Sequence, residues 1–252
     1  MSEIDTSPVR GDAPRTVDDA FLADVSRDYE RMSAQAIIAH ALYQPWFDRP
    51  AVVSSFGAEA VVLLHLITRI KPDVPVIFID TGKLFGETLR YRDRLQHVLG
   101  LEDVRTVGPR LAEVKEIDPM GLLNRQSPDR CCDLRKTSVL ERALSLHGAW
   151  LNGRKRFQND LRADIDIVAR DEAGRIKLTP LANWSAKDIK EYILGENLPL
   201  HPLVKQGYPS IGCFPCTSKV APGDDARAGR WQGRDKTECG IHGRGAAPKK
   251  SQ

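Results

Sequence analysis

Two apolar segments without alternation most restrict what this chain can fold into. Residues 58–70 are apolar almost all round, and residues 74–79 form a short apolar run. The first segment has the length of a helix buried on all sides, and the second has the length of a strand covered on both faces. Since a strand is covered on both faces only where helices flank its sheet, the pair predicts part of a parallel sheet.

Similar patterns continue on both sides of this pair. They predict strands at 51–55, from about Val104, at 149–151 and at 175–178, and helices at 17–43, 86–99 and 136–147. Ser185 has an acidic residue, Asp188, three positions later, which is typical of a helix N-terminus and predicts a helix to about Gly195. The alternation predicts an α/β fold with a twisted, mostly parallel sheet and helices on both faces.

The periodic pattern covers only part of the chain. Residues 1–16 are interrupted by Pro and Gly, and we expect a disordered lead-in there. Residues 17–202 carry the alternation and form the expected α/β domain. Beyond Pro202 the periodicity fades and Gly, Pro, Cys and charged residues dominate. Residues 203–252 are therefore expected to form a functional appendage that ends in a C-terminal tail.

Composition excludes several classes of protein. The 252 residues carry a net charge of only +3, which is too balanced for a nucleic-acid coat or a membrane-surface protein. No apolar run approaches the roughly 18 residues of a membrane span, and the first residues lack a secretion signal, so we expect a cytoplasmic protein. Residues 226–252 hold seven basic and two acidic side chains, a tail that suits nucleic acid, a small anion or solvent alone.

Four of the five cysteines occur in two close pairs. Cys213 and Cys216 have the two-residue gap that turns both sulfurs toward one centre in zinc and iron–sulfur sites. Cys131 and Cys132 are adjacent, and neighbouring side chains on a helix diverge by about 100°, so both reach one centre only where the chain turns. A helical period beginning near Lys136 places them at a helix start, where the dipole favours thiolates.

The residue types do not select the metal. Four thiolates around zinc or around a [4Fe–4S] core both leave a net charge of about −2, and Arg135 and Lys136 are placed to offset either one. Buried, inert thiols are a third interpretation. The odd number of cysteines argues against a disulfide framework in a reducing compartment.

The fifth cysteine has different neighbours. Cys239 is surrounded in sequence by few apolar residues and lies close to Arg234, Lys236 and His242. An exposed thiol beside cationic groups is favoured as the thiolate, the reactive form of cysteine. Cys239 is therefore a candidate nucleophile, and a surface cysteine without a role is the alternative.

A second candidate site follows the first predicted strand. The loop containing Ser55, Phe56 and Gly57 offers hydroxyl and backbone N–H groups that can cradle a phosphate at a helix N-terminus. It lacks the Lys-Ser/Thr ending of a P-loop, which disfavours triphosphate hydrolysis with that lysine. Further basic residues at 154–156 and 227–230 suggest an anionic ligand if the fold brings them together.

In combination these residues identify a family. The chain resembles the assimilatory sulfonucleotide reductases, specifically the bacterial adenylyl-sulfate reductases that bind an iron–sulfur cluster. The resemblance runs from about Ala51 to His242. Its motifs are Ser55-Phe56-Gly57-Ala58-Glu59, Asp80-Thr81-Gly82, Cys131-Cys132-Asp133-Leu134-Arg135-Lys136, the segment 207–216 with Cys213 and Cys216, Arg227-Ala228-Gly229-Arg230-Trp231, and Glu238-Cys239-Gly240-Ile241-His242.

The resemblance implies a specific chemistry. It implies a fold like that of the adenine nucleotide alpha hydrolases, and a [4Fe–4S] cluster held by Cys131, Cys132, Cys213 and Cys216. Adenylyl sulfate would be reduced to sulfite and AMP through an S-sulfonate on Cys239. Thioredoxin or a similar dithiol protein would supply the electrons, and the pathway would be assimilatory sulfate reduction. Family members without the cysteine pairs use the 3′-phosphorylated substrate, so this chain is expected to prefer adenylyl sulfate.

The resemblance also implies substrate contacts. Lys136 would lie between the cluster and the substrate, and Arg227 and Arg230 would help to hold the sulfonucleotide. Arg156 is the expected contact from the segment 153–158, which departs from the usual Gly-Gln-Arg-Arg-Asp-Gln pattern. Ala60 and the single aromatic residue Trp231 are further departures from the family pattern.

Three alternatives stay open at this point. A reductase of 3′-phosphoadenylyl sulfate would share most of these motifs. An ATP-using thiolation enzyme with a metal site would need a Ser-Gly-Gly loop, which residues 55–59 do not provide. A zinc-stabilised nucleic-acid-binding module would explain the cysteine pairs and the basic tail but not the α/β core. Neither a nucleic-acid partner nor a membrane is expected, and the sequence leaves open a homo-oligomer.

Overall fold

The computed structural model describes residues 17–234, 236, 238 and 240–241, and its centre is one six-stranded sheet. The strands are β1 (Pro50–Val53), β2 (Val76–Ile79), β3 (Val104–Val107), β4 (Ala149–Leu151), β5 (Val168–Arg170) and β6 (Ile176–Leu178). Their order is β3-β2-β1-β4-β6-β5, and every pair is parallel except β5 with β6. The predicted mostly parallel α/β fold is confirmed.

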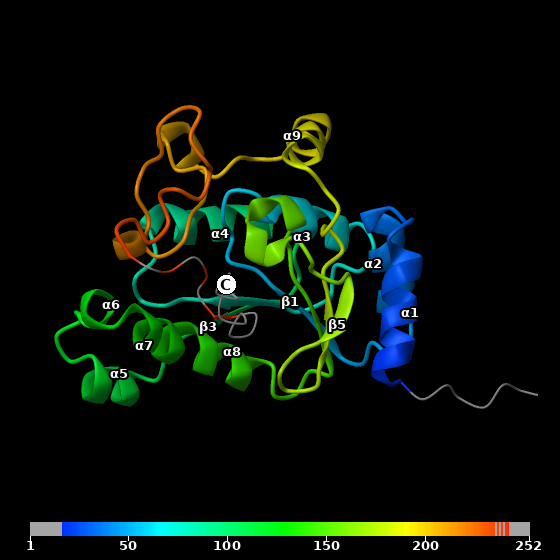
Figure 1. Cartoon of the computed structure of the whole chain (residues 1–252), viewed down its shortest axis with the longest axis horizontal. Coiled ribbons are helices and arrows are strands. Elements are labelled where there is room, and N and C mark those ends of the chain that lie inside the picture. The colour runs from blue at the N-terminus through cyan, green and yellow to red at the C-terminus, as the bar shows by residue number, and fades with distance from the viewer. Residues whose placement is uncertain (1–16, 235, 237, 239, 242–252) are drawn as a thin grey trace, which may run out of the picture.

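Helices cover both faces of the sheet, as Figure 1 shows. They are α1 (Asp19–Tyr29), α2 (Ala34–Leu42), α3 (Ala60–Thr68), α4 (Gly86–Leu99), α5 (Leu111–Ile117), α6 (Leu123–Gln126), α7 (Pro128–Cys132), α8 (Ser138–Ala143) and α9 (Ala186–Gly195). Helices α3, α4 and α9 lie on one side, and α8 lies on the other side together with α5, α6 and α7. No helix in the described part of the chain is long and apolar enough to cross a membrane.

The pleat of the strands divides the apolar side chains between two cores. Val52, Phe78 and Leu151 belong to the larger core, which also contains side chains of α3. Ala51 and Trp150, one residue away on the same strands, belong to a smaller core with side chains of α8. Successive side chains on a strand point to opposite faces, so a strand buried on both faces is apolar at every position. This explains why residues 74–79 showed no alternation.

The predicted helix at 17–43 is wrong in one respect, because the chain forms two helices there. Helix α1 ends at Tyr29, and α2 begins after Ser33, whose Oγ accepts a hydrogen bond from the backbone N–H of Ala36 at 3.2 Å. Residues 30–33 contain no Pro or Gly, so the apolar period alone did not reveal the break. A side-chain cap satisfies backbone donors that a continuous helix would have paired internally.

The prediction that Cys131 and Cys132 lie at the start of a helix beginning near Lys136 is also wrong. Helix α7 begins at Pro128, a residue favoured in a first turn, and the two cysteines are its last residues. A π-helical turn at Asp133–Thr137 then leads directly into α8. The helical segment therefore starts earlier than its apolar period indicates, and it contains one wide turn.

The strand β5 was not predicted. It has only three residues, and it pairs antiparallel with β6. The Oγ of Ser26 on α1 accepts hydrogen bonds from the backbone N–H groups of Ile167 and Val168 at 3.1 and 3.2 Å. The strand is thus held by residues far away in the sequence, which a local pattern does not contain.

The segment after Pro202 packs against the sheet domain. Leu203 and Ile211 form a small apolar cluster with Phe85, the residue before α4. The backbone N–H of Phe214 donates to the carbonyl of Lys83 at 2.8 Å, and Cys213 forms an isolated bridge with Leu84. These contacts place the second cysteine pair beside the loop that follows β2. The predicted lead-in at 1–16 lies outside the described residues.

Candidate active site and cysteine cavity

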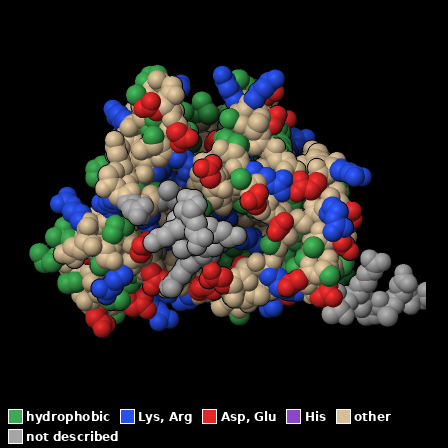
Figure 2. Space-filling view, viewed as in Figure 1, with side chains coloured by type: hydrophobic (Ala, Val, Ile, Leu, Met, Phe, Trp, Pro, Cys, Tyr) green, Lys and Arg blue, Asp and Glu red, His purple; other side chains and the backbone are tan. Residues whose placement is uncertain are grey.

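A cavity of about 400 Å³ lies at the carboxyl edge of the sheet. The strand order changes direction between β1 and β4, so the loops after these two strands diverge there and leave a crevice, which is where α/β proteins commonly bind ligands. Both loops line the cavity, together with residues 209–212, 225–227 and 230–231 of the C-terminal segment. Figure 2 shows Lys and Arg side chains in the recessed centre of one face of the molecule.

The loop after β1 contributes Ser55 and Gly57 to the cavity wall. Phe56 has a positive φ of 48° and donates its backbone N–H to Ser54 Oγ at 3.2 Å. A bulky residue in this backbone region is strained, which often marks a functional loop. The Phe56 ring points into the core, where its centroid lies 5.3 Å from that of Phe78. Phe56 therefore shapes the loop but does not line the cavity with its side chain.

The loop after β4 brings Arg154, Lys155 and Arg162 to the cavity. Lys155 is buried, and its Nζ donates to Glu59 Oε2 at 2.6 Å. Burial lowers the pKa of Lys155, and the neighbouring carboxylate of Glu59 opposes this change. Gln158 donates to the same oxygen at 2.9 Å. The loops after β1 and β4 are thus tied together through Glu59.

Arg156, the substrate contact expected from the sequence, does not line the cavity. Its guanidinium donates to both carboxylate oxygens of Glu30 at 2.6 and 3.0 Å, and to the carbonyl of Ile165 at 2.7 and 2.9 Å. These contacts attach the loop to the residue that follows α1. In this structure the carboxylate of Glu30, outside the cavity, is the ion-pair partner of Arg156.

Arg227 and Arg230 both line the cavity, together with Trp231. The guanidinium carbon of Arg230 lies 4.4 Å from the centroid of the Trp231 indole, within the range of a cation–π contact. Trp231 is buried and has a positive φ of 50°. A Cβ on Gly212 would collide with the Arg230 guanidinium, so a glycine is needed for this approach. The sequence analysis named Trp231 as part of a motif and as a departure from the family pattern, but it did not predict this contact with Arg230.

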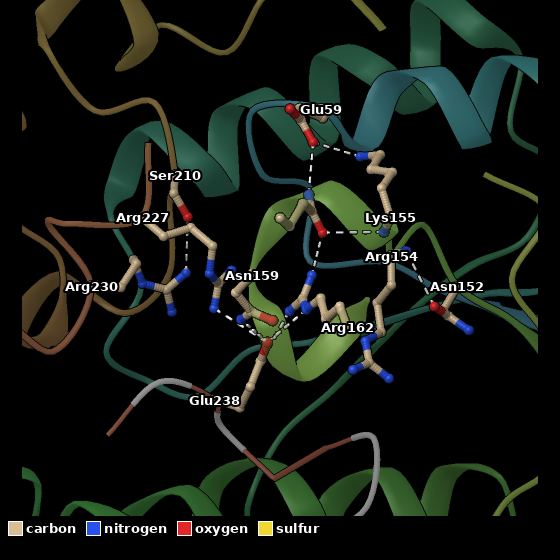
Figure 3. Close-up of polar contacts among 11 residues, drawn as sticks. Glu59, Asn152, Arg154, Lys155, Asn159, Arg162, Ser210, Arg227, Arg230 and Glu238 are labelled. Atoms are coloured by element: carbon tan, nitrogen blue, oxygen red, sulfur yellow. Dashed lines mark hydrogen bonds and ion pairs between the residues drawn. The ribbon is translucent and has the colours of Figure 1, made fainter. Parts of the chain in front are cut away.

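Glu238 extends from the tail into the same cavity, as Figure 3 shows. Its carboxylate accepts hydrogen bonds from Arg162 at 2.6 and 2.8 Å and from Asn159 at 2.8 Å. Arg227 lies 3.6 Å away. Although burial raises the pKa of Glu238, these partners outweigh it and lower the pKa to about 2. Cys239, the candidate nucleophile, lies outside the described residues.

The charge of the cavity is positive. Six basic and three acidic side chains line it: Lys136, Arg154, Lys155, Arg162, Arg227 and Arg230 against Glu59, Asp225 and Glu238. Basic groups around a recess attract and hold anions, and arginine is well suited to phosphate-like and sulfate-like oxygens. The cavity thus suits an anionic ligand with some apolar surface, since Leu63, Ile79 and Phe157 also line it.

A second, much smaller cavity adjoins the first and is lined by all four paired cysteines: Cys131, Cys132, Cys213 and Cys216. Thr81 Oγ1 lies 3.3 Å from Cys213 Sγ. Arg135, in the π-helical turn after α7, donates to the Thr81 carbonyl at 2.9 Å and to Asp118 at 2.8 Å. Its buried guanidinium thus connects this turn to the loop after β2. The structure therefore brings together two cysteine pairs that are about eighty residues apart in sequence.

The donor set is that of a soft metal centre. Burial raises the pKa of the Cys131 thiol, and the nearby Arg135 opposes this rise. A buried thiol ionises readily when a metal replaces its proton. Within the described residues, no three Cys, His, Asp or Glu side chains are close enough to hold one metal ion.

Two residues line both cavities. Lys136 and Trp231 form part of the wall of the anion-binding cavity and part of the wall of the cysteine cavity. Lys136, which the resemblance places between a cluster and a substrate, therefore lies where the two cavities adjoin.

The profile of the phosphoadenosine phosphosulfate reductase domain matches residues 49–219, which is more than half of the chain. The chain belongs to this reductase family. The matched region contains the loop after β1 and both cysteine pairs, and it ends before Arg227 and Glu238.

Relatives of the reductase family cover most of this chain. It is 47% identical over 214 residues to a protein of Mesorhizobium japonicum named adenosine 5′-phosphosulfate reductase, a match that covers 85% of this chain and 84% of the relative. It is 37% identical over 230 residues to a protein of Gloeobacter violaceus named phosphoadenosine 5′-phosphosulfate reductase. That match covers 90% of this chain and 95% of the relative. Among solved structures, the phosphoadenylyl-sulfate reductase of Candida auris superposes with a TM-score of 0.70 at 24% identity, covering 82% of this chain and all of that one, which supports the shared fold.

Proposed function

We propose that this protein reduces adenylyl sulfate to sulfite and AMP in assimilatory sulfate reduction. The observation that carries the proposal is the pair of adjoining cavities, one basic and one lined by four cysteines, which share Lys136. Membership of the reductase family and the name of the Mesorhizobium relative support it. The proposed nucleophile, Cys239, follows Glu238 directly in the sequence, and Glu238 lines the basic cavity.

Binding of the substrate would rest on charge and on the loop after β1. Adenylyl sulfate carries a sulfate joined to a phosphate, so both halves of this group are anionic. Arg154, Arg227 and Arg230 line the cavity and supply cations for these oxygens. Ser55 and Gly57, ahead of α3, supply a hydroxyl and backbone N–H groups at its N-terminal end. The cations also stabilise the charge that develops on the leaving phosphate.

The proposed reaction has two stages. First, the Cys239 thiolate attacks the sulfur of the substrate, a bond from that sulfur to the bridging oxygen breaks, and AMP leaves with the electron pair. This stage forms an S-sulfonate on Cys239. Second, a thiolate of a dithiol protein such as thioredoxin attacks Cys239 Sγ, and sulfite leaves. The second thiol of the partner then displaces Cys239, so the partner ends as a disulfide and has supplied two electrons.

We propose that the cysteine cavity holds a [4Fe–4S] cluster through Cys131, Cys132, Cys213 and Cys216. All four sulfurs line one small cavity, and four thiolates are the ligand set of such a cluster. When bound, the cluster would supply negative charge and structural support beside Lys136. A redox role is not required, because the dithiol partner already provides both electrons.

An anaerobic assay with each sulfonucleotide and thioredoxin tests this proposal. We expect sulfite from adenylyl sulfate at a rate well above that from the 3′-phosphorylated form. Faster turnover of the 3′-phosphorylated substrate would support the alternative that the name of the Gloeobacter relative suggests. A brown protein with broad visible absorption is expected from the cluster, and a colourless protein that contains zinc would contradict it.

A further inference from the structure

Glu238 connects the tail to a chain of polar contacts that crosses the basic cavity (Figure 3). Arg162, which holds the Glu238 carboxylate at 2.6 and 2.8 Å, also donates to Gln158. Gln158 donates to Glu59 on the loop after β1 at 2.9 Å. The position of the tail is therefore tied, through side chains alone, to the loop that borders the opposite wall of the cavity.

The two ends of the described tail are attached at different places. Glu238 is held by Arg162 and Asn159 on the loop after β4. Ile241 packs against the apolar cluster between the sheet and α8, and it also lines the cavity. The described tail is thus attached to the loop after β4 at Glu238 and to the apolar cluster beside α8 at Ile241.

The described lining of the cavity holds more basic than acidic residues, with Glu238 counted among the acidic ones. Glu238 is held by Arg162 and Asn159, with Arg227 at the longer distance of 3.6 Å. Lys136, Arg154 and Arg230 line the same cavity. Arg162 holds both oxygens of the Glu238 carboxylate, and such a bidentate contact fixes direction as well as distance.

We infer that Glu238 is a positioning residue, whose contact with Arg162 and Asn159 sets where the next residue enters the cavity. The inference rests on the proposed function, because the next residue is the proposed nucleophile Cys239. Displacement of a nucleophile by about 1 Å can slow a reaction a hundredfold. Glu238 would thus govern the rate of S-sulfonate formation and leave nucleotide affinity largely unchanged.

The test compares Glu238→Gln with the unaltered chain, both carrying the iron–sulfur cluster. We expect kcat for sulfite formation to fall by about tenfold or more, while the affinity for AMP changes less than about twofold. Deuterium uptake by the peptide that contains residues 236–241 should become faster in the variant. Asn159→Ala should change kcat and uptake in the same direction but less, and Glu238→Asp should restore part of the rate.

The matched control is Glu116→Gln, which removes the same charge at an exposed position of α5. This variant should leave kcat, AMP affinity and deuterium uptake unchanged. An unchanged kcat in Glu238→Gln, or weaker AMP binding with kcat retained, would overturn the inference. If the unaltered protein forms no sulfite from adenylyl sulfate, the proposed function fails instead. Deuterium uptake and AMP binding would still report whether Glu238 holds the tail.

Discussion

The guanidinium of Arg135 and the carboxylate of Asp118 form an ion pair at 2.8 Å, and both side chains are at least nine-tenths buried. Burial raises the pKa of Asp118, but hydrogen bonds from Arg135 and from the backbone N–H of Leu123 outweigh it, and the net shift is downward. Removing one partner of a buried pair leaves an uncompensated charge, which costs about 3–5 kcal/mol.

We therefore expect Arg135→Ala to lower the free energy of unfolding by an amount of that size, measured by urea denaturation. The exposed pair of Arg105 and Asp103 provides the comparison. Arg105→Ala should cost about 1 kcal/mol or less. Equal losses in the two variants would show that burial of the Arg135 pair contributes nothing.

Cys239→Ser should abolish sulfite formation and retain nucleotide binding, because a hydroxyl cannot replace a thiolate as nucleophile. Sulfite release and AMP affinity are measured on the same preparation. In the unaltered protein, labelled sulfate should accumulate on the tail when the dithiol partner is withheld. Full turnover by the variant would disprove the assigned role.

Cys213→Ser should give a pale and less stable protein, since metal-binding free energy contributes directly to folding. The visible spectrum and the thermal unfolding temperature report the two effects. Cys239→Ser is the control, because it removes a thiol from the tail and should leave the brown colour intact. A brown and fully stable Cys213→Ser protein would contradict the ligand assignment.

Arg227→Ala should raise KM for adenylyl sulfate by about tenfold or more, as expected from the loss of a charged hydrogen bond. Arg156→Ala should leave KM nearly unchanged, since its guanidinium is bound to Glu30 outside the cavity. The comparison of the two KM values separates the basic residues that line the site from those that only neighbour it in sequence.

Because His201 is buried, we expect the free energy of unfolding to depend on pH. Its side chain is fully buried, it accepts a hydrogen bond from the N–H of Leu203 at Nδ1, and Nε2 lies 3.1 Å from Thr88 Oγ1. Burial lowers its pKa from 6.5 to about 4. The unfolded chain therefore takes up a proton at a higher pH than the folded protein does.

The stabilising contribution of neutral His201 is complete above pH 6.5 and is lost as the pH falls toward 4. We expect the free energy of unfolding to drop by about 2 kcal/mol between pH 7.5 and pH 5 from this residue. Urea titrations at the two pH values measure the drop, and His201→Gln should reduce it by that amount. An identical drop in the variant would show that other groups cause it.

Those strands and helices could be predicted whose apolar pattern lies within consecutive residues of the sequence. The strand predicted at 74–79 is β2 at Val76–Ile79, and the helix predicted at 86–99 is α4 with the same bounds, because both patterns lie in consecutive side chains. The strand β5 could not be predicted in this way, because three residues carry no period and Ser26 on α1 holds its end. The break before Ser33 depended on a side-chain cap within an otherwise helical pattern.

Those parts of the site could be predicted that show in the spacing of residues along the sequence. The close cysteine pairs indicated a common centre, and the structure places all four around one cavity. Spacing did not distinguish Arg156 from Arg162, two residues of the same type six positions apart. Only the folded loop decides that Arg162 faces Glu238, 76 residues away, and that Arg156 faces α1.

The wide turn at Asp133–Thr137 takes up one residue more than an α-helical turn would. Before it, Cys131 and Cys132 face the small cavity, and after it, Val139 and Leu140 are buried against the sheet. If these residues closed into ordinary α-helical turns at the same chain length, one half would rotate by about 100° relative to the other. Either the thiols or the apolar side chains would then face the wrong way, so the wide turn keeps both sets of side chains correctly placed.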